Sequence, residues 1–242
     1  MKTIVITGAS GGIGSEITSI LAKNHNRLIL VYNSNKQSIV NLEQKFFNKC
    51  EVHIYKCDLK NAASVTKFAN TIISKFNTID ALINCAGVSK FQQIQDTTEQ
   101  DYLDIMDTNL KSVVLLTSLL SKNMISNKSG KIVNISSIWG KVGSSMESLY
   151  SASKGAINAL TLSLAKELGP SNICVNAICP GLIDTKMNDN INADSISDFV
   201  ENTPLRRIGK PKDVANLVEF LISDKANFIT GQLINVDGGF SV

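Results

Sequence analysis

Residues 2–14 read KTIVITGASGGIG, a short β-branched run that passes directly into a glycine-rich turn. A helical pattern follows over residues 15–21. Strand, glycine turn and helix in this order form a known phosphate-binding arrangement, in which Gly8 allows the tight turn, Gly12 lets the backbone approach a pyrophosphate, and Gly14 lets helix and strand pack closely. A plain tight turn is the alternative, but the strand-to-helix context favours nucleotide binding.

The same alternation of strand and helix continues through the first third of the chain. Apolar runs at residues 27–32, 52–57 and 81–84 predict strands, and helical patterns at 37–48 and 62–76 predict the helices between them. Strands that alternate with helices form a parallel sheet, because each crossover helix returns the chain to the same end of the sheet. The sequence therefore predicts an α/β fold with a doubly wound parallel β-sheet and helices on both faces.

The length and composition indicate a single globular domain. We favour one nucleotide-binding domain over residues 1–242 rather than two small domains. Hydrophobic residues make up 43% of the chain and charged residues 19%, which is typical of globular proteins. No run reaches the roughly 18 continuous apolar residues of a membrane helix, and residues 1–10 lack the apolar core and cleavage site of a signal peptide. We therefore expect a cytoplasmic protein with no membrane contact.

The charge balance and the supply of metal ligands argue against two further classes of function. A net charge of +3 with only three arginines is too weak to predict nucleic-acid binding. The five cysteines are odd in number and mostly lie in apolar runs, so buried thiols are expected rather than disulfides. With two histidines and no Cys-x-x-Cys pair, no metal site is expected.

Residues 136–154, SSIWGKVGSSMESLYSASK, contain the residue types of a proton-transfer site. If Tyr150 lies near the start of a helix, Lys154 lies one turn later on the same face, and its positive charge favours the phenolate. The tyrosine pKa must fall by roughly 3 units from about 10 for work near neutral pH. Ser137, at the end of the apolar run KIVNIS, can donate to a carbonyl oxygen and accept from the phenol. Taken alone, the Tyr-Lys pair also fits a solvated helix face.

The end of the strand at 27–32 bears on the choice of dinucleotide. A site that prefers NAD usually carries an acidic residue there, which accepts from the ribose 2′-hydroxyl. This chain has Asn33 and Ser34 instead, with Lys36 close by and no acid between residues 28 and 40. A 2′-phosphate would meet polar groups and a cation rather than a repelling carboxylate, so NADP(H) is favoured over NAD.

More polar and glycine residues follow the strands at the same edge of the predicted sheet. Asp58, after the strand at 52–57, is placed to accept from an adenine amino group. Asn84, Ala86 and Gly87 form a small, glycine-containing exit from the next strand. Ligands of such sheets bind at this carboxyl edge, although each residue alone also fits ordinary turn chemistry.

Two long apolar helices are predicted at residues 98–124 and 149–168. Asn109 lies inside the first, where an asparagine either faces solvent or bends the helix by bonding to backbone. Both helices are apolar on more than one face, which suggests a helix-mediated subunit interface, with a deep core as the alternative. Residues 185–205 are polar and weakly periodic, and we expect them to form a mobile lid over a substrate cleft.

Together these motifs resemble those of the classical short-chain dehydrogenases/reductases, over essentially the whole chain. The family pattern is matched in order and spacing by TGASGGIG at 7–14, NCAG at 84–87, Asn109 in DTNL, YSASK at 150–154 and PG at 180–181. The resemblance implies a single-domain Rossmann fold with a seven-stranded parallel sheet, an NADP(H) cofactor and assembly as a homotetramer.

The resemblance also implies the chemistry, a hydride transfer between nicotinamide and a carbonyl or alcohol. Tyr150 would act as general acid in reduction, and Ser137 would polarise the carbonyl oxygen. Lys154 would lower the tyrosine pKa and hold the nicotinamide ribose, and Asn109 would bend its helix and hold a water that relays protons to Lys154. The cofactor-binding residues that the resemblance implies are Gly8, Ser10, Gly11, Gly12, Ile13 and Gly14 for the pyrophosphate, Asn33 for the 2′-phosphate region, Asp58 and Leu59 for adenine, Asn84 for the adenosine ribose with Ala86 and Gly87 beside it, Tyr150 and Lys154, and Pro180, Gly181, Ile183 and Thr185 for the nicotinamide end.

Two positions depart from the family pattern. Many NADPH-using members have arginine at the position of Gly11, so one phosphate contact is missing here. Cys85 replaces the second asparagine of the usual NNAG, which we expect to be a tolerated buried substitution.

Within the family, PLRRIGKPKDVAN at 204–216 and ITGQLINVDGG at 229–239 most resemble the 3-oxoacyl-[acyl-carrier-protein] reductases of fatty acid biosynthesis. The resemblance implies an acyl thioester or acyl-carrier protein as substrate. Those enzymes dock the acidic carrier with two basic residues; Lys128 falls on the first position and Ser171 on the second, which puts carrier docking in question.

Other segments support a different substrate. VYNSN at 31–35 and SSIWG at 136–140 resemble the elongation factor P 5-aminopentanone reductases, which act on a modified lysine of a folded protein. That activity is the main alternative, and a sugar- or steroid-alcohol dehydrogenase is another. A nucleotide sensor without chemistry is a third, against which the full set of Asn109, Ser137 and the Tyr-Lys pair argues.

Overall fold

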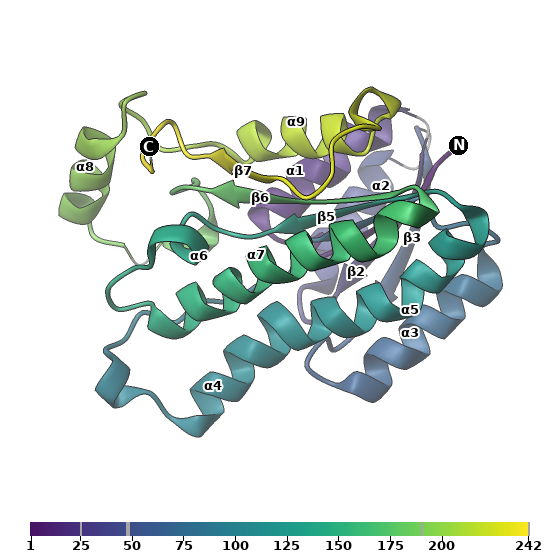
Figure 1. Cartoon of the computed structure of the whole chain (residues 1–242). Helices are drawn as coiled ribbons and strands as arrows, with labels where there is room; N and C mark the ends of the chain where they lie inside the picture. Colours follow the sequence, from purple (N-terminus) through teal and green to yellow (C-terminus); the bar gives the residue numbers. More distant parts are fainter. Residues whose placement is uncertain (25, 47–48, 190, 242) are drawn as a thin grey trace.

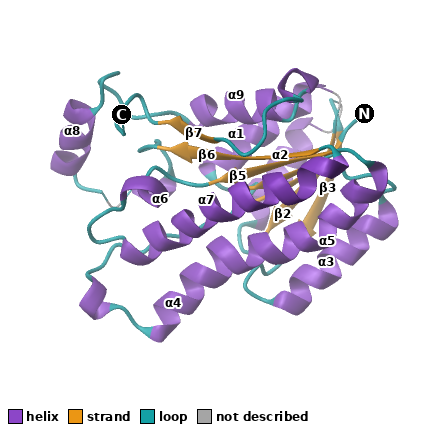
Figure 2. Ribbon diagram, in the orientation of Figure 1, coloured by secondary structure: helices purple, strands orange, loops and turns teal. Residues whose placement is uncertain are grey.

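One parallel sheet forms the centre of the molecule. The computed structural model describes residues 1–24, 26–46, 49–189 and 191–241. Within them the chain forms a seven-stranded sheet of order β3-β2-β1-β4-β5-β6-β7, with every pair of neighbours parallel and helices on both faces (Figures 1 and 2). The predicted doubly wound α/β fold is thereby confirmed.

The bounds of the elements follow the sequence patterns closely. The strands are β1 (Thr3–Thr7), β2 (Arg27–Tyr32), β3 (Glu51–Lys56), β4 (Ala81–Asn84), β5 (Gly130–Ile135), β6 (Ile173–Pro180) and β7 (Leu233–Val236). The α-helices are α1 (Gly12–Leu21), α2 (Lys36–Phe46), α3 (Ala62–Lys75), α4 (Glu99–Met106), α5 (Ser112–Asn127), α6 (Trp139–Val142), α7 (Ser148–Leu168), α8 (Ala193–Asn202) and α9 (Pro211–Leu221). The expected last two residues of the helix at 37–48 lie outside the described residues.

Alternate residues of the central strands face two separate cores. In β1, Ile4 and Ile6 belong to one core and Val5 to the other. Helices α1, α2 and α9 cover the first core, and α3, α5 and α7 cover the second (Figure 1). Every residue of β1, β4 and β6 is buried, which explains why these strands are continuous apolar runs in the sequence.

The long helix predicted over residues 98–124 contains a π-helical turn. Thr98 starts α4 with a capping box that it shares with Asp101. A π-helical turn, Asp107–Lys111, then joins α4 to α5. Helical backbone therefore runs from Glu99 to Asn127, as the pattern predicted, and the amide of Asn109 bonds to the backbone of Val88 and holds the wider turn in place.

The segment predicted to form a lid contains a helix that the sequence pattern did not identify. Asn192 caps α8 by accepting from the backbone N–H of Ser195 at 2.7 Å. Phe199 on this helix stacks on Phe240 with ring centres 4.2 Å apart, and α8 lies beside the C-terminus at the left of Figure 1. Residue 190 of the expected lid lies outside the described residues. The mobility of this segment stays a prediction.

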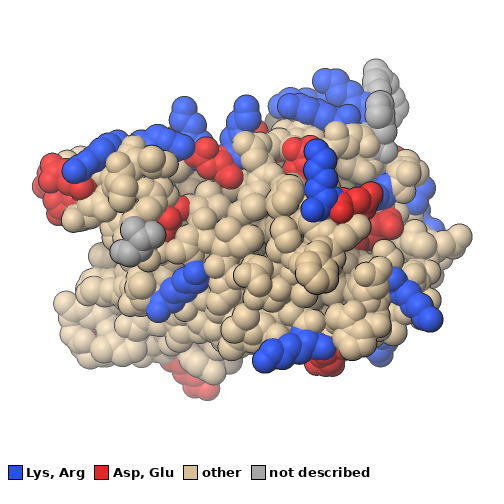
Figure 3. All heavy atoms as spheres, turned by 45° about the horizontal axis from the view of Figure 1, so that its top comes forward, with Lys and Arg blue, Asp and Glu red and all other residues tan. Residues whose placement is uncertain are grey.

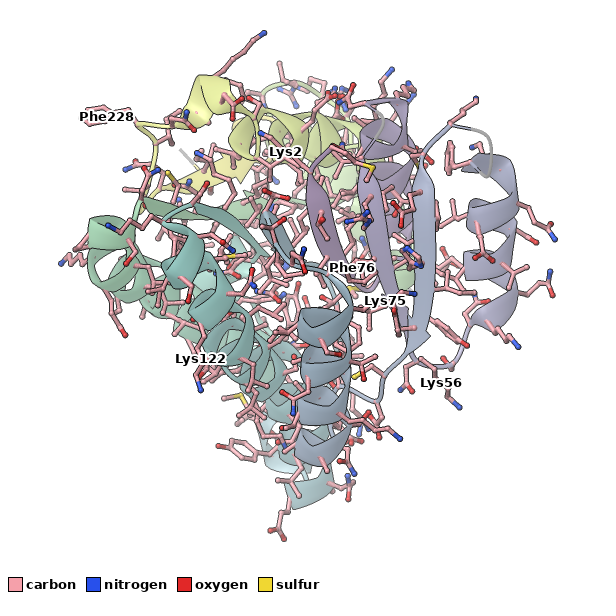
Figure 4. All side chains as sticks on the ribbon, turned by 90° about the vertical axis from the view of Figure 1, so that its right-hand side faces the viewer. Lys2, Lys56, Lys75, Phe76, Lys122 and Phe228 are labelled. Atoms are coloured by element: carbon pink, nitrogen blue, oxygen red, sulfur yellow. The ribbon has the colours of Figure 1, made fainter. Side chains whose placement is uncertain are left out.

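At the outer edge of the sheet, His53 of β3 packs against Phe76, with ring centres 5.0 Å apart. Figure 4 looks toward this edge and labels Phe76, the residue after α3. The Arg27 guanidinium carbon lies 5.1 Å from the centre of the Phe76 ring, so a cation–π contact covers the end of the second core. Among the described residues, no helix is long and apolar enough to cross a membrane.

Candidate active site

The turn after β1 has close contacts that only glycine permits. Gly8 has a φ of +64°, and a Cβ there would lie 2.8 Å from the Cα of Ala86. A Cβ on Gly14 would lie 2.2 Å from the carbonyl oxygen of Gly8, and one on Gly12 would lie 2.7 Å from the Cγ2 of Thr185. The glycines at the start of α1, whose first amides have no partner within the helix, therefore carry no side chains of their own that would keep a phosphate group away.

Thr7 joins this turn to the exit of β4. Its hydroxyl accepts from the backbone N–H groups of Cys85 at 3.1 Å and Ala86 at 3.2 Å. β1 and β4 are the neighbours at which the strand order reverses, with β2 and β3 on one side and β5 to β7 on the other. The predicted residues Ala86 and Gly87 therefore lie at the topological switch point, where ligands of doubly wound sheets bind.

The residues predicted for the adenosine end of a dinucleotide follow β2 and β3 at the same edge. Asn33 is exposed after β2, as is Lys36 at the start of α2. Asp58 is exposed after β3, and its Oδ1 accepts from the backbone N–H of Lys60 at 3.1 Å. Leu59 is buried beside it. The structure brings these residues to one edge, as predicted from the parallel topology.

The side chain of Asn84 turns away from this edge into the protein. Its Nδ2 donates to the Oδ1 of Asn134 at 2.9 Å, and Asn134 in turn donates to the hydroxyl of Thr161 at 2.9 Å. All three side chains are buried, so this chain of hydrogen bonds links β4 to β5 and α7. The ribose contact predicted for Asn84 can therefore come only from its main chain.

The segment after β6 returns toward the glycine turn. Pro180 ends the strand, and Gly181 begins the turn that follows. Ile183 is buried and forms an isolated parallel bridge. This anchor brings Thr185 against Gly12, so the two segments predicted for opposite ends of the cofactor lie side by side.

The predicted catalytic side chains lie together at the start of α7. Tyr150 is in the first turn, and the Nζ of Lys154 lies 5.6 Å from the centre of its ring. This Nζ donates to the carbonyl oxygen of Ile135 at 2.7 Å. The hydroxyl of Ser137 accepts from the backbone N–H of Trp139 at 3.1 Å and lies near enough to Tyr150 to lower the pKa of its phenol. The spacing in the sequence therefore identified a constellation that is close in space.

Asn109 lies on the other side of Lys154. Its Nδ2 donates to the carbonyl oxygen of Val88 at 2.9 Å and to the hydroxyl of Ser153 at 3.0 Å, and its Oδ1 accepts from the N–H of Val88 at 2.8 Å. A Cβ on Gly87 would lie 3.4 Å from the Nζ of Lys154 and 3.5 Å from the Oδ1 of Asn109. Asn109 thus marks the bend and borders the site, while its role in holding a water stays a prediction.

Burial sets the proton affinities of the tyrosine and the lysine. It raises the pKa of Tyr150 to about 12, although the hydrogen bond with Ser137 acts in the opposite direction. It lowers the pKa of Lys154 to about 8. The predicted lowering of the tyrosine pKa is not observed, because removal from water disfavours the charged form of both groups. Tyr150 is therefore protonated near neutral pH, as a proton donor must be.

The lowered pKa of Lys154 leads to a pH dependence of ketone reduction. Lys154 is charged below about pH 8 and neutral above it. Because the charge stabilises the phenolate that remains after proton donation, we expect kcat/KM for reduction to fall as the pH rises through about 8. The measurement is kcat/KM in a buffer series of constant ionic strength. A value that stays flat to pH 10 would show that the charge of Lys154 is not required.

Three aromatic rings lie beyond Ser137. Trp139 meets Phe199 and Phe240 edge-on, with ring centres 6.4 and 5.7 Å away. The sequence did not reveal the two phenylalanines, because they follow in distant segments and no spacing rule connects them to Trp139. They join α8 and the C-terminal segment to the wall of the site.

A nicotinamide dinucleotide fits these residues. The cradle of the glycine turn, in which Ser10 and Ile13 are half-buried and Gly11 is exposed, has no space for side chains but leaves backbone amides for a pyrophosphate. The turn lies at the edge that carries Tyr150 and Lys154. Within the described ranges, no group of three or more His, Cys, Asp or Glu side chains is placed to hold a metal ion.

Comparisons of the sequence find relatives along its whole length. A family model described as enoyl-(acyl carrier protein) reductase matches residues 8–241. The chain is 39% identical over 241 residues to the uncharacterized oxidoreductase YmfI of Bacillus subtilis, covering 99% of this chain and 98% of that protein. It is 35% identical over 238 residues to a 3-oxoacyl-[acyl-carrier-protein] reductase of Buchnera aphidicola, covering 98% and 96%.

Solved structures agree with the fold. A candidate gluconate dehydrogenase from Agrobacterium tumefaciens superposes with a TM-score of 0.95 at 28% identity, covering 99% of this chain and 96% of that one. A short-chain type dehydrogenase/reductase from Mycobacterium ulcerans superposes with a TM-score of 0.93 at 29% identity, covering 99% and 90%.

Proposed function

The chain belongs to the short-chain dehydrogenase/reductase family of nicotinamide-dependent oxidoreductases, and from this we propose that it reduces a ketone to a secondary alcohol with NADPH. One observation carries the proposal: Ser137, Tyr150 and Lys154 lie together at the start of α7, where the Nζ of Lys154 is 5.6 Å from the centre of the tyrosine ring and the hydroxyl of Ser137 acts on the pKa of the tyrosine. A carbonyl oxygen placed between the two hydroxyls would receive one hydrogen bond and one proton.

The residues of the chain divide the work of reduction among them. When bound, the reduced nicotinamide supplies a hydride to the carbonyl carbon. Ser137 donates to the carbonyl oxygen and orients it, and Tyr150 gives its proton to the same oxygen. Lys154, held by the carbonyl of Ile135, stabilises the phenolate that remains. Ser137 and Lys154 are buried and Tyr150 is half-buried, which strengthens these interactions.

We propose NADPH rather than NADH as the hydride donor. The support is the exposed pair of Asn33 and Lys36 after β2, where a 2′-phosphate meets an amide and a cation. Asn33→Asp places a carboxylate there that repels the phosphate and accepts from a free 2′-hydroxyl. We expect the ratio of kcat/KM for NADPH to that for NADH to fall at least about tenfold, measured with one ketone and both cofactors.

Asn41→Asp is the matched control for this prediction. Asn41 is exposed in α2 and its Oδ1 accepts from Gln37 at 2.9 Å, a bond that an aspartate preserves. It adds the same charge farther along the helix, so the cofactor ratio should stay within about twofold of wild type. If Asn33→Asp left the ratio of kcat/KM for NADPH to that for NADH unchanged, the 2′-phosphate would not bind at this position.

For the substrate, we propose first a 3-oxoacyl thioester on an acyl-carrier protein. The support is the 35% identity to a protein named as such a reductase and the acyl-carrier-protein description of the matching family model. The test compares NADPH oxidation with acetoacetyl thioester and with elongation factor P that carries a 5-aminopentanone group. Rapid turnover of the thioester supports this assignment, and turnover of the modified protein alone overturns it.

The second candidate, reduction of the ketone on elongation factor P, is favoured by the surface where a carrier would dock. Lys128 and Ser171 lie close together, since Asn172 donates to the carbonyl oxygen of Lys128 at 3.3 Å. Only the first of the two docking positions is basic. On the face shown in Figure 3, basic side chains are interspersed with acidic ones rather than forming one continuous basic patch. A weakened carrier-docking surface suits a different protein substrate.

We further propose assembly as a homotetramer through α5 and α7. Their exposed large apolar side chains include Val114 and Ile125 on α5 and Leu162 on α7. Docking positions at the C-terminal ends of these helices lie roughly 30 Å from Tyr150, at a rise of about 1.5 Å per residue over α7. At that distance, a carrier bound at Lys128 would serve the active site of a neighbouring subunit. Sedimentation of the purified protein measures the mass of the assembly and so tests for the tetramer.

A further inference from the structure

A carboxylate lies beside the proton donor and is not used by the mechanism above. Glu147 comes three residues before Tyr150 and is half-buried at the start of α7. Among the influences on the pKa of Tyr150, its negative charge is the next after burial and the hydrogen bond from Ser137, and it raises that pKa. The carboxylate therefore acts on the reacting hydroxyl through space.

The position of Glu147 is set by contacts from a second segment. The hydroxyl of Ser89, just beyond the exit of β4, donates to its Oε1. Met146, the residue before it, has a φ of +64°, an unusual value for a side chain of this size. The carbonyl of Met146 accepts from the N–H of Gln92 at 2.7 Å. Two bonds from the 89–92 segment thus hold the strained backbone and aim the carboxylate.

No protein cation pairs with this carboxylate in the part of the chain that the structure describes. The lysines nearest in the fold or the sequence are engaged elsewhere. Lys90 pairs with Asp101 at 2.5 Å, Lys141 donates to Asn235 at 2.5 Å, and Lys154 donates to Ile135 at 2.7 Å. Among the described residues, Glu147 therefore has the hydroxyl of Ser89 as its partner and no counter-charge.

This charge opposes the reaction of a neutral substrate. Proton donation leaves a phenolate on Tyr150, and a second negative charge nearby disfavours it. A cation bound between the phenolate of Tyr150 and the carboxylate of Glu147 would offset their repulsion, because it is attracted to both negative charges. The start of α7 also interacts favourably with a carboxylate, but that effect is independent of the substrate.

We propose that Glu147 determines specificity by binding a cationic amine on the substrate, so that the site prefers ketones that carry a positive charge near the carbonyl group. The inference rests on the proposed ketone reduction and adds the substrate class. Glu147 directly precedes the first turn of α7, which carries Tyr150, so a nitrogen a few bonds from the carbonyl carbon of a bound ketone reaches the carboxylate.

The test uses two ketones of the same shape. 5-(Trimethylammonio)pentan-2-one carries a permanent charge, and 6,6-dimethylheptan-2-one replaces the charged nitrogen with carbon. With the purified protein and NADPH, we expect kcat/KM to favour the cationic ketone at least about tenfold at low salt. In Glu147→Gln, the kcat/KM values for the two ketones should lie within about twofold of each other, because turnover of the cationic ketone weakens and that of the neutral ketone improves.

Two further variants separate this role from a structural one. Glu167→Gln removes the same charge from an exposed site near the other end of α7 and should keep the preference. Ser89→Ala leaves the charge of Glu147 but releases its carboxylate, so we expect a partial loss of the preference for the cationic ketone. This variant keeps the test valid if Glu147→Gln does not fold. Equal turnover of both ketones by the wild type, or an unchanged ratio in both Glu147→Gln and Ser89→Ala, overturns the inference alone. Absence of NADPH oxidation with these ketones and with acetoacetyl thioester overturns the proposed function itself.

Discussion

Replacing Tyr150 with phenylalanine is expected to slow ketone reduction by about a hundred- to ten-thousandfold, the usual contribution of a general acid. The variant keeps the ring and loses only the hydroxyl that Ser137 contacts. NADPH affinity should stay within a few-fold of wild type, since the phosphates bind at the glycine turn. Steady-state turnover and titration of cofactor fluorescence measure the two effects separately.

Tyr55→Phe is the matched control for this variant. Tyr55 lies on β3 and packs against Phe68, with ring centres 5.6 Å apart, in the core away from the switch point. The Tyr55→Phe variant also loses one tyrosine hydroxyl, and it should keep the turnover of the wild type. Normal turnover by Tyr150→Phe would show that the tyrosine is not the proton donor.

Replacing Lys154 with methionine should inactivate the enzyme while making the free protein more stable. Without the cation the phenolate left by Tyr150 is not stabilised, and we expect kcat to fall at least about a hundredfold with weaker binding of NADPH. Burial lowers the pKa of Lys154 to about 8 from about 10.4 in an unfolded chain, so keeping it charged at pH 7 costs about 3 kcal/mol. Methionine removes that cost and loses the bond to Ile135, worth about 1 kcal/mol.

The pH dependence of this stabilisation identifies its origin. Between about pH 8 and 10.4 the unfolded chain binds more protons than the folded one, so the wild type gains stability as the pH rises through that window. The advantage of Lys154→Met, about 2 kcal/mol at pH 7, should therefore shrink toward pH 10. Urea unfolding at several pH values measures it. A destabilised variant with the same deficit at every pH would show that Lys154 is not held at an electrostatic cost.

Local patterns were enough to predict the elements that carry their own signals. The glycine turn, β4 and the Tyr150–Lys154 spacing each depend on residues adjacent or one turn apart, and the structure reproduces them. Parallel topology then brought distant strand exits to one edge without further information.

Features decided by distant contacts could not be predicted in the same way. The apolar pattern of residues 98–124 continues across the π-helical turn, and only the bond from Asn109 to Val88 shows where the turn lies. Asn84 looked like a ligand at a strand exit, but its partner is Asn134 on the neighbouring strand. The sign of the Tyr150 pKa shift also depended on burial, which the spacing to Lys154 does not report.

The carboxylate of Glu147 bears on the choice between the two candidate substrates. A 5-aminopentanone group has a basic nitrogen that can pair with Glu147, whereas an acetoacetyl thioester has none. The same ketone needs no basic pair at Lys128 and Ser171. The proposed role of Glu147 beside the tyrosine and the replacement at Ser171 at the far end of α7 support the second candidate, the protein-bound ketone, whereas the sequence identity supports the first, the acyl thioester.

The most direct test of the central claim is the loss of NADPH absorbance in the presence of a ketone, measured in parallel for the wild type and Tyr150→Phe. The candidate active site predicts turnover of at least one of acetoacetyl thioester, the cationic ketone and modified elongation factor P by the wild type, and almost none by the variant. Oxidation of NADPH at equal rates by both proteins, or by neither with any of these substrates, would contradict it.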